Sequence, residues 1–496
     1  MTITLSAATL SELPEGVARP GYDRAALTPG IVHFGVGNFH RAHQAVYLDA
    51  LIEAGEGEGW GLVGAGVLPS DARMRETLAA QNYLTTVVRQ WAEGADARVI
   101  GPMVDFLPVG DAAAIIAQLS DPAIRIVSLT VTEGGWCIDP ATGAFDPAHP
   151  LIEADAARPD APESVFGLIA AGLRARRAAG TAPFTVMSCD NLPHNGKVAR
   201  AAVAGMARRW DADLADWIEA GVSFPNGMVD RITPATGDRE RAALRDQFGI
   251  ADASPVFCED FIQWVLEDDF PAGRPALEKV GVQFVPDVTP YENMKIRVLN
   301  GGHAIIAYPA GLLGIEFAHE AMAHPLIDAF LTKVEEEEVL PSFDAPEGED
   351  KNAYLQLIRR RFANPKIADQ VRRLCLDGSN RQPKFIIPTV ADRLAAGGPV
   401  AGLALESALW RRYCLGVDEA GAAIAPNDPS WDRLTAAAAR AEDDPMEWLA
   451  MEDIYGATGR DDRFRAAFAA AHAALKAEGV EATLRRYLSG GLSGGA

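Results

Sequence analysis

The chain has 496 residues, a formal net charge of -23 and a hydrophobic content of 48%. A prior of about 100–200 residues per domain predicts roughly two to four domains. The negative charge, with no lysine- or arginine-rich run to offset it, argues against nucleic acid and anionic membrane surfaces as partners.

No apolar stretch approaches the roughly 20 residues that cross a bilayer, and the N-terminus does not resemble a signal peptide. Five scattered cysteines without a CxxC pair favour free thiols, so we expect a cytoplasmic protein.

The N-terminal half alternates apolar runs with helical runs. The segment IVHFGVG leads into a helical stretch, and further strand-like runs occur at WGLVGAGV, YLTTVVRQW, IRIVSLTVTEGG and FTVMSCDN. Strands that alternate with helices predict a mostly parallel sheet with helices on both faces. We therefore expect an α/β fold, with a Rossmann-like dinucleotide-binding domain over residues 1–285.

The pattern changes to helical periodicity from about residue 286 onward. Segments such as KIRVLNGGHAIIA, AYLQLIRRRFAN and DDRFRAAFAAAHAALKAEG repeat apolar residues at helical spacing, and no strand alternation accompanies them. The sequence therefore predicts a mainly α-helical second domain over residues 286–496.

The first apolar strand ends in a glycine turn at Gly35 and Gly37. A dinucleotide fold needs glycine there because the turn is tight and the pyrophosphate approaches bare backbone. The third glycine of GxGxxG is missing and His40 stands in its place, so the motif alone is weak. His40 and His43 also have the spacing of a helical metal pair, but no third ligand at a familiar spacing accompanies them. Packing or phosphate contact is the role we expect for these histidines.

An acidic residue, Asp71, follows the second strand and is the candidate partner of the adenosine ribose hydroxyls. It lies further along the chain than the usual ≈ 20 residues after the glycine turn. An acid at this point favours NAD over NADP, although Arg73 and Arg75 nearby would suit a 2′-phosphate, and a solvated surface acid is the plain alternative. We assign the cofactor site to Gly35, Gly37, Phe39, His40, Arg41, Asp71 and Glu133.

The stretch YENMKIRVLNGGH, residues 291–303, carries two competing interpretations of one lysine. Tyr291 and Lys295 have the Tyr-x-x-x-Lys spacing of short-chain dehydrogenases, in which the tyrosine is the base. Alternatively, Lys295 is itself the base. On an α-helical wheel with Lys295 at zero, Glu292 falls at about 60°, His303 at about 80° and Asn300 at about 140°. The polar groups thus share one arc, whereas Tyr291 falls outside it and the chain is about twice the usual short-chain length, which favours the lysine.

Aliphatic side chains line this arc, and its burial has consequences for the lysine. A buried polar group without a partner costs about 1–3 kcal/mol, so such a face persists only if its members satisfy one another or a ligand. Burial also disfavours the ammonium form of Lys295, as a general base for alcohol oxidation requires. Gly301 and Gly302 each cost about 1 kcal/mol of helix propensity relative to alanine, which implies that another backbone or a ligand comes close.

The other half of the site is expected at the carboxyl ends of the parallel strands. Asn191 follows the apolar run FTVMSC, and its amide together with that of Asn300 would hold an alkoxide or ketone oxygen, as in an oxyanion hole. Glu133 follows another strand, and with Glu292 it is a candidate for carrying the proton to water. Taken alone, an asparagine after a strand is more often a turn residue and a helical histidine more often a core group. The conjunction of these residues favours a site.

Together these segments resemble the mannitol dehydrogenase family, the polyol-specific long-chain dehydrogenases and reductases. The resemblance covers nearly the whole chain, through GVGNFHRAHQAVYLDAL, IVSLTVTEGG, FTVMSCDNLPHNGK, VSFPNGMVDRITP, VTPYENMKIRVLNGGH and DGSNRQPKF. It implies NAD as the cofactor, a lysine base that needs no metal, and an oxyanion held by asparagine, with these roles falling on Lys295, Asn191 and Asn300 and the positioning of the hydroxyl on His303. It also implies substrate contacts at Asp230, Arg373, Arg381 and Lys384. Arg381 is a departure, because related enzymes carry lysine there.

The resemblance implies oxidation of a polyol to a ketose, with D-mannitol and D-fructose as the first pair, by a monomer or small homo-oligomer. D-arabinitol, D-sorbitol and the hexuronates fructuronate and tagaturonate are the alternatives. The sugar-acid reductases tend to carry a lysine where this chain has Gly134, which favours a neutral polyol. A catalytically silent NAD-binding protein is a hypothesis from another class, and it leaves the cluster of Lys295, Asn300 and His303 unexplained.

Overall fold

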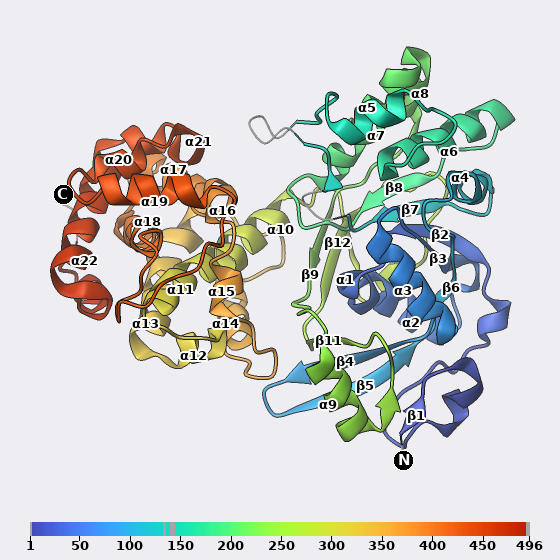
Figure 1. The fold of residues 1–496 in the computed structure, drawn as a ribbon, viewed down its shortest axis with the longest axis horizontal. Helices are drawn as coiled ribbons and strands as arrows, with labels where there is room; N and C mark the ends of the chain where they lie inside the picture. Colours follow the sequence, from blue (N-terminus) through green and yellow to red (C-terminus); the bar gives the residue numbers. More distant parts are fainter. Residues whose placement is uncertain (1, 132–134, 139–143, 493–496) are drawn as a thin grey trace. The chain divides into compact units, whose positions relative to one another are not determined.

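The computed structural model describes residues 2–131, 135–138 and 144–492. The chain divides into two compact units, Met1–Thr289 and Pro290–Ala496, called here the first and the second unit. In Figure 1 the first unit runs from blue to green and the second from yellow-green to red. Each unit has its own hydrophobic core and is described separately.

The first unit is built around a five-stranded sheet with the strand order β6-β3-β2-β7-β8. All pairings in it are parallel, as strands separated by helices require. From β2 in the middle, the chain first adds strands on one side and later on the other, so the order reverses at β2. In a doubly wound sheet the ligand binds at the carboxyl ends of the strands where this reversal occurs. The strands are β2 (Pro29–Phe34), β3 (Gly61–Ala65), β6 (Met103–Phe106), β7 (Ile126–Leu129) and β8 (Thr185–Ser188).

Both faces of this sheet are covered, as the apolar character of its strands predicts. On β2, Val32 and Phe34 enter one hydrophobic core with residues of α4, α6 and α7, whereas Ile31 points to a second core shared with α2 and β12. The Rossmann-type α/β fold class predicted for this part of the chain is confirmed. The helices are α1 (Asn38–Ala42), α2 (Gln44–Glu53), α3 (Pro69–Ala80), α4 (Ala112–Ser120), α5 (Pro150–Ala156), α6 (Val165–Ala179), α7 (Asn195–Trp210), α8 (Ala212–Gly221) and α9 (Asp238–Phe248).

Smaller sheets accompany the main one. The run YLTTVVRQW does form a strand, but it pairs antiparallel with the next strand along the chain in a separate three-stranded sheet, β11-β4-β5. A second three-stranded sheet has the order β13-β12-β9, and a two-stranded one pairs β1 with β10. Their strands are β1 (Ile3–Thr4), β4 (Thr85–Trp91), β5 (Gly94–Ile100), β9 (Gly227–Asp230), β10 (Ile250–Ala251), β11 (Val256–Glu259), β12 (Gln263–Glu267) and β13 (Gln283–Val285).

The second unit is mainly helical, and its described residues contain isolated β-bridges but no longer strand. Its helices pack around one core, in which α18 contacts both α11 and α22. Two turns are π-helical, at Lys295–Asn300 and Glu335–Val339. The α-helices are α10 (Thr289–Met294), α11 (Gly301–Leu312), α12 (Ala318–Ala323), α13 (Pro325–Val334), α14 (Lys351–Phe362), α15 (Val371–Leu374), α16 (Gly378–Phe385), α17 (Ile387–Ala395), α18 (Ala401–Tyr413), α19 (Trp431–Arg440), α20 (Met446–Leu449), α21 (Glu452–Tyr455) and α22 (Asp462–Leu488).

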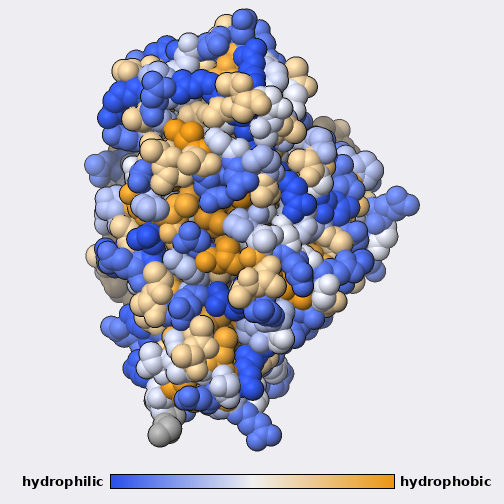
Figure 2. Space-filling view, turned by 90° about the vertical axis from the view of Figure 1, so that its right-hand side faces the viewer, coloured by the Kyte–Doolittle hydropathy of each residue, from blue (hydrophilic) through white to orange (hydrophobic). Residues whose placement is uncertain are grey.

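The surface and the cysteines agree with the expectations from composition. On the face drawn in Figure 2, hydrophobic side chains are interspersed with hydrophilic ones. Within the described ranges, no helix has both the length and the apolar character of a membrane span. All five cysteines are buried free thiols, which confirms the prediction from their spacing.

Candidate active site

The glycine turn lies at the carboxyl end of β2, where the strand order reverses. Gly35 has a φ of +90°, and a Cβ atom there would lie 2.1 Å from the carbonyl oxygen of Thr130. The Thr130 hydroxyl donates to the Gly35 carbonyl oxygen at 2.7 Å, which ties the turn to the end of β7. α1 begins one residue after Gly37. This bare, fixed backbone fits the close approach of a dinucleotide pyrophosphate.

The buried side chains of His40 and Arg41 lie beside the glycine turn. The His40 ring stacks on His33 with 3.5 Å between ring centroids. Burial lowers the pKa of His40 well below its usual value, and neither ring nitrogen has a hydrogen-bond partner among the described residues. The buried guanidinium of Arg41 donates to the Gly37 carbonyl oxygen at 3.2 Å and to the Ser254 hydroxyl at 3.1 Å. Arg41 thus holds the protein backbone, which makes its contribution to a cofactor site indirect.

His43 makes packing and backbone contacts. His43 packs against Phe39, with 4.9 Å between ring centroids, and its Nε2 lies 2.9 Å from the Gln263 carbonyl oxygen. Phe39 is partly buried in the core below β2. In the described part of the chain, no group of three or more histidine, cysteine and acidic side chains is arranged to hold a metal ion.

Asp71 caps the start of α3. Its Oδ2 accepts hydrogen bonds from the backbone N–H groups of Val67 and Leu68, each at 2.9 Å. Its other oxygen, Oδ1, makes no hydrogen bond within the described ranges, so one side of the carboxylate remains for a ribose. The side chain of Arg75 binds the protein itself, because its Nε donates to the Phe106 carbonyl oxygen at 2.8 Å. Arg73 is exposed. The assignment of Asp71 to the ribose stays a prediction. Glu133 lies outside the described residues.

The loop that carries Asn191 is fixed by a residue that sequence reasoning missed. Asn195 is fully buried, and its Nδ2 donates to the carbonyl oxygens of Gly227 at 2.8 Å and Asp190 at 3.0 Å. Its Oδ1 accepts the Gly227 N–H at 2.9 Å. The side chain thereby joins the end of β8 to the start of β9, the strand that ends at the buried Asp230. The only hint in the sequence is an asparagine directly before a glycine, which is more often a turn signal.

Asp190 binds groups of the preceding segment of the chain. Its Oδ2 accepts the Val131 N–H at 3.0 Å and the indole N–H of Trp136 at 3.2 Å. Asn191, next along the chain, is exposed. Asn191 therefore lies at the carboxyl end of the sheet, on a loop that the hydrogen bonds of Asp190 and Asn195 fix in place.

The helix that carries Lys295 departs from the wheel expected for a regular α-helix. The chain makes a π turn at Lys295–Asn300, in which the Gly301 N–H donates to the Ile296 carbonyl oxygen five residues back. A π turn takes in about one extra residue, so the residues after it rotate back by about 100°. Asn300 then moves from about 140° to about 40°, and His303 from about 80° to about −20°. The π turn therefore gathers Lys295, Asn300 and His303 more tightly than an α-helix would.

The helix begins at Thr289, whose backbone N–H donates to Asp287 Oδ1 at 2.9 Å. The polar residues of the arc are buried as expected, with exposed fractions of 5% for Glu292, 6% for Lys295 and 9% for Asn300.

His303 has an unsatisfied nitrogen. Its Nε2 is buried and has no hydrogen-bond partner among the described residues, and its ring stacks on Phe362 with 4.2 Å between centroids. Burial is the main cause that lowers the pKa of His303 to about 3; Asp369 opposes the shift and nearby arginines contribute to it. The imidazole is therefore neutral at physiological pH. Because a buried polar atom without a partner costs about 1–3 kcal/mol, Nε2 is a hydrogen-bonding position at which a bound ligand would recover this cost.

The predicted substrate contacts of the second unit lie on two neighbouring short helices. Arg373, on α15, forms an ion pair with Asp369, its Nε donating to Oδ1 at 2.6 Å. Arg381, on α16, donates through Nη1 to the Leu374 carbonyl oxygen at 3.3 Å. Lys384, one turn further along α16, is exposed. Arg373 and Arg381 both act on the pKa of His303, so the structure brings these three residues together within the second unit.

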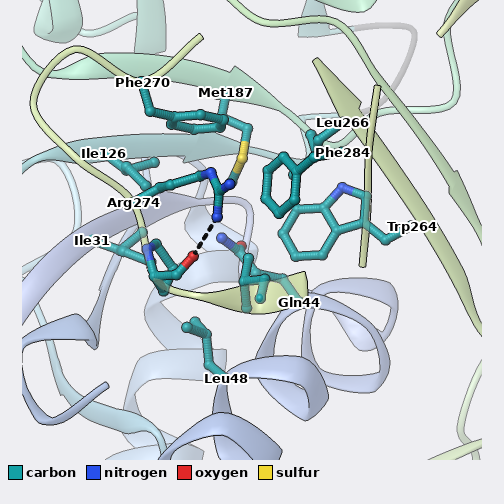
Figure 3. Close-up of a pocket in the computed structure, with 12 residues that line it drawn as sticks. Ile31, Gln44, Leu48, Ile126, Met187, Trp264, Leu266, Phe270, Arg274 and Phe284 are labelled. Carbon is teal, nitrogen blue, oxygen red and sulfur yellow. Dashed lines mark hydrogen bonds between the residues drawn. The ribbon is translucent and has the colours of Figure 1, made fainter. Parts of the chain in front are cut away.

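A small apolar pocket elsewhere in the first unit is not this site. It lies beneath the sheet, between Ile31, Ile126 and the aromatic rings of Trp264 and Phe284 (Figure 3). The guanidinium of Arg274 covers the Phe284 ring at 3.5 Å from its centroid. None of the predicted site residues lines this pocket, so it is a gap in the packing of the second core.

Comparison with known proteins decides the family. The model of the mannitol dehydrogenase Rossmann domain matches residues 29–279, and that of the mannitol dehydrogenase C-terminal domain matches residues 287–476. The chain belongs to the mannitol dehydrogenase family. The family predicted from the sequence is thus confirmed, together with the pairing of a Rossmann domain and a helical domain.

Relatives within this family are similar over almost the whole chain. Mannitol 2-dehydrogenase of Cereibacter sphaeroides is 61% identical over 478 residues, which are 96% of this chain and 100% of the relative. Its counterpart in Pyrenophora tritici-repentis is 41% identical, over 98% of this chain and 86% of the relative.

Two solved structures share the fold. Mannitol 2-dehydrogenase of Pseudomonas fluorescens, in a ternary complex with NAD and D-mannitol, is 46% identical with a TM-score of 0.89, over 98% of this chain and 100% of that one. A D-sorbitol dehydrogenase in substrate-free form is 37% identical with a TM-score of 0.89, over 97% of this chain and 100% of that one.

Proposed function

We propose that this chain is an NAD-dependent dehydrogenase that oxidises a secondary alcohol of a polyol to a ketone, with D-mannitol to D-fructose as the reaction expected first. The observation that carries the proposal is the cluster of Lys295, Asn300 and His303 around one π turn, with the buried Nε2 of His303 free to bind. The 61% identity to a mannitol 2-dehydrogenase supports it. So does the 46% identity to a protein solved with NAD and D-mannitol.

The first unit supplies the residues that would hold NAD. Gly35 and Gly37 offer bare backbone to the pyrophosphate, and the remaining oxygen of Asp71 would accept a ribose hydroxyl, which favours NAD over NADP. Bound NAD supplies the acceptor for the hydride that leaves the carbinol carbon. His40 and Arg41 keep the glycine turn in shape from below.

Lys295 is the proposed base. Its burial removes water from the ammonium and favours the neutral amine, which accepts the proton of the substrate hydroxyl. Asn300 donates an amide hydrogen to the oxygen as it becomes negative, and the family resemblance assigns a second such donor to Asn191. His303, held neutral against Phe362, fixes the hydroxyl through Nε2. Glu292, also buried, is the proposed relay that passes the proton onward to water.

The remaining substrate groups would be held by hydrogen-bonding side chains. Asp230, Arg373, Arg381 and Lys384 are the proposed contacts. No step in this scheme requires a metal, because Lys295 takes the proton and the asparagines hold the charge. We also propose a monomer or a small homo-oligomer, which light scattering of the purified protein would measure.

Reduction of a hexuronate is the second candidate, and one observation favours it. Arg361, Arg373 and Arg381 all lower the pKa of His303, and Asp369 raises it. Arginines bind carboxylates in a two-bond geometry. A neutral polyol remains the first candidate because this chain has Gly134 at the position where the sugar-acid reductases tend to carry a lysine.

The test is turnover by the purified protein. D-mannitol with NAD should produce NADH, also after treatment with a chelator, and NADH should be oxidised faster with fructose than with fructuronate. Lys295→Met removes the amine while keeping a similar shape, so turnover should be nearly abolished. Full turnover by this variant would overturn the lysine base, and faster oxidation with fructuronate would select the second candidate.

A further inference from the structure

A buried side-chain pair fastens α16 to the core of the second unit. α16 carries Arg381 and Lys384, and on its inner side Gln382 donates through Nε2 to Glu406 Oε1 at 2.5 Å. Glu406 belongs to α18, the central helix of the unit. Both side chains are almost completely inaccessible to solvent, with exposed fractions of 1% for Gln382 and 0% for Glu406.

The pair is incomplete if Glu406 is a carboxylate. Gln382 Oε1 and Glu406 Oε2 are both buried, and neither has a hydrogen-bond partner among the described residues. A carboxylate has no hydrogen to donate, so it forms only one bond with an amide that faces it. A neutral carboxyl has one O–H, which can donate from Glu406 Oε2 to Gln382 Oε1. Protonation thus provides partners for both atoms at once.

We propose that Glu406 keeps its proton at neutral pH and forms a two-bond acid–amide pair with Gln382, which makes Glu406 a positioning residue for the substrate contacts on α16. The proposal rests on the proposed function, because it takes Arg381 and Lys384 as those contacts. Glu406 itself touches neither substrate nor cofactor in this scheme.

The surroundings of the pair favour the neutral acid. Burial raises the pKa of Glu406 to about 8, although the side chains of Gln382 and Ser407 oppose the rise. No cation among the described residues lowers this pKa. The titratable groups that face Glu406 are the hydroxyls of Tyr308 on α11 and Tyr455 on α21. Tyr455 accepts the indole N–H of Trp448 at 2.7 Å. A carboxylate in this cluster would be a buried charge without a counter-ion, which is far more costly than a neutral acid.

A second contact shows how closely α16 is fitted to the core. Gly378, the first residue of α16, leaves no room for a side chain, because a Cβ atom there would lie 2.6 Å from Trp410 Nε1 and 2.8 Å from the Tyr308 hydroxyl oxygen. Ser379 is held by Asp428, with its hydroxyl donating to Oδ1 at 2.7 Å. The start of α16 is therefore fixed by contacts that do not involve Glu406. The position of its second turn, which carries Arg381 and Lys384, depends on the Gln382–Glu406 pair.

The test compares Glu406→Gln with the wild type across pH. A glutamine keeps both hydrogen bonds as an amide–amide pair but cannot ionise. As the pH rises from about 7 to about 10, the wild-type KM for the polyol should rise several-fold while kcat is unaffected by this group, and the KM of E406Q should stay flat. Glu406→Leu, which keeps the volume but neither bond, should have the high KM at every pH. An equal rise of KM in the wild type and E406Q would overturn the proposal.

An infrared difference spectrum tests the proton without any turnover. Wild type minus E406Q at neutral pH should contain the C=O band of one protonated carboxyl, and this band should disappear at alkaline pH. A carboxylate band at neutral pH would refute the pair even if the enzyme is active. If no polyol is turned over at any pH but the protonated band is present, the proposed function fails while the acid–amide pair stands.

Discussion

Replacing Asn195 by alanine tests whether this side chain holds the loop of Asn191. The amide makes four hydrogen bonds, donating to the carbonyl oxygens of Ser188, Asp190 and Gly227 and accepting the Gly227 N–H. Each is worth a net of about 1 kcal/mol, and a buried backbone group left without a partner adds about 1–3 kcal/mol. Because water enters part of the vacated space, we expect the free energy of unfolding to fall by about 3–5 kcal/mol.

The assay is urea unfolding followed by tryptophan fluorescence, together with turnover at a temperature where the variant is folded. Asn352→Ala is the matched control, because Asn352 is exposed and its side chain makes no hydrogen bond within the described ranges. The control should change stability by less than about 0.5 kcal/mol. We expect Asn195→Ala to lose kcat as well, since Asn191 is then no longer fixed. A loss of less than about 1 kcal/mol with wild-type turnover would refute the reasoning.

Three further predictions concern the cofactor turn and the catalytic helix. Lys295→Met should retain NAD binding, measured by fluorescence titration, while losing turnover. Gly35→Ala should weaken NAD binding and destabilise the protein by more than Gly16→Ala, measured by calorimetry, because both glycines have positive φ but only Gly35 would place a Cβ atom against the Thr130 carbonyl oxygen. His303 should show no imidazole titration in NMR spectra between about pH 5 and 8. Since the pKa of His303 is lowered to about 3, the wild type should lose stability relative to His303→Gln as the pH falls below about 6.5, because only the unfolded state then binds the proton.

The parts of the fold that sequence reasoning predicted are those set by local patterns. The glycine turn, the parallel strands and the change to helices near residue 286 each follow from spacing within one segment. The run YLTTVVRQW was recognised as a strand, but its partner could not be read from its own residues. Its pairing depends on the hairpin with β5 and on β11, a strand far away in the sequence.

Among the candidate site residues, too, local patterns were predictable from the sequence and contacts between distant segments were not. Lys295, Asn300 and His303 can be recognised in the sequence from their spacing. The π turn has no such signature, so the sequence predicts a regular α-helix in its place. Asn195 could not be recognised, because its role lies entirely in bonds to backbone groups of two strands. The sequence predicts a ribose contact at Asp71 from the position of its carboxylate after β3. It does not predict that Asp71 caps α3, because this depends on how the chain turns after β3.

The two glycines after the π turn explain how an unfavourable helix is stabilised. We expected a ligand or another backbone to come close, and the close neighbours within the second unit are protein atoms. A Cβ atom on Gly301 would lie 3.4 Å from the Phe385 carbonyl oxygen at the end of α16, and one on Gly302 would lie 3.3 Å from both Glu335 Oε1 and the Phe362 ring. Phe362 is the ring on which His303 stacks.

The helix that carries Lys295 is thus stabilised by packing against its neighbours and not by its own helix propensity. Two glycines cost about 1 kcal/mol each relative to alanine, and π turns are rare in proteins. Glu335 adds a further cost, because both of its oxygens are buried without a hydrogen-bond partner among the described residues and burial raises the pKa of its carboxyl well above the usual value. The glycines let the end of α16 and Phe362 approach the helix, and the Phe362 ring in turn stacks on His303.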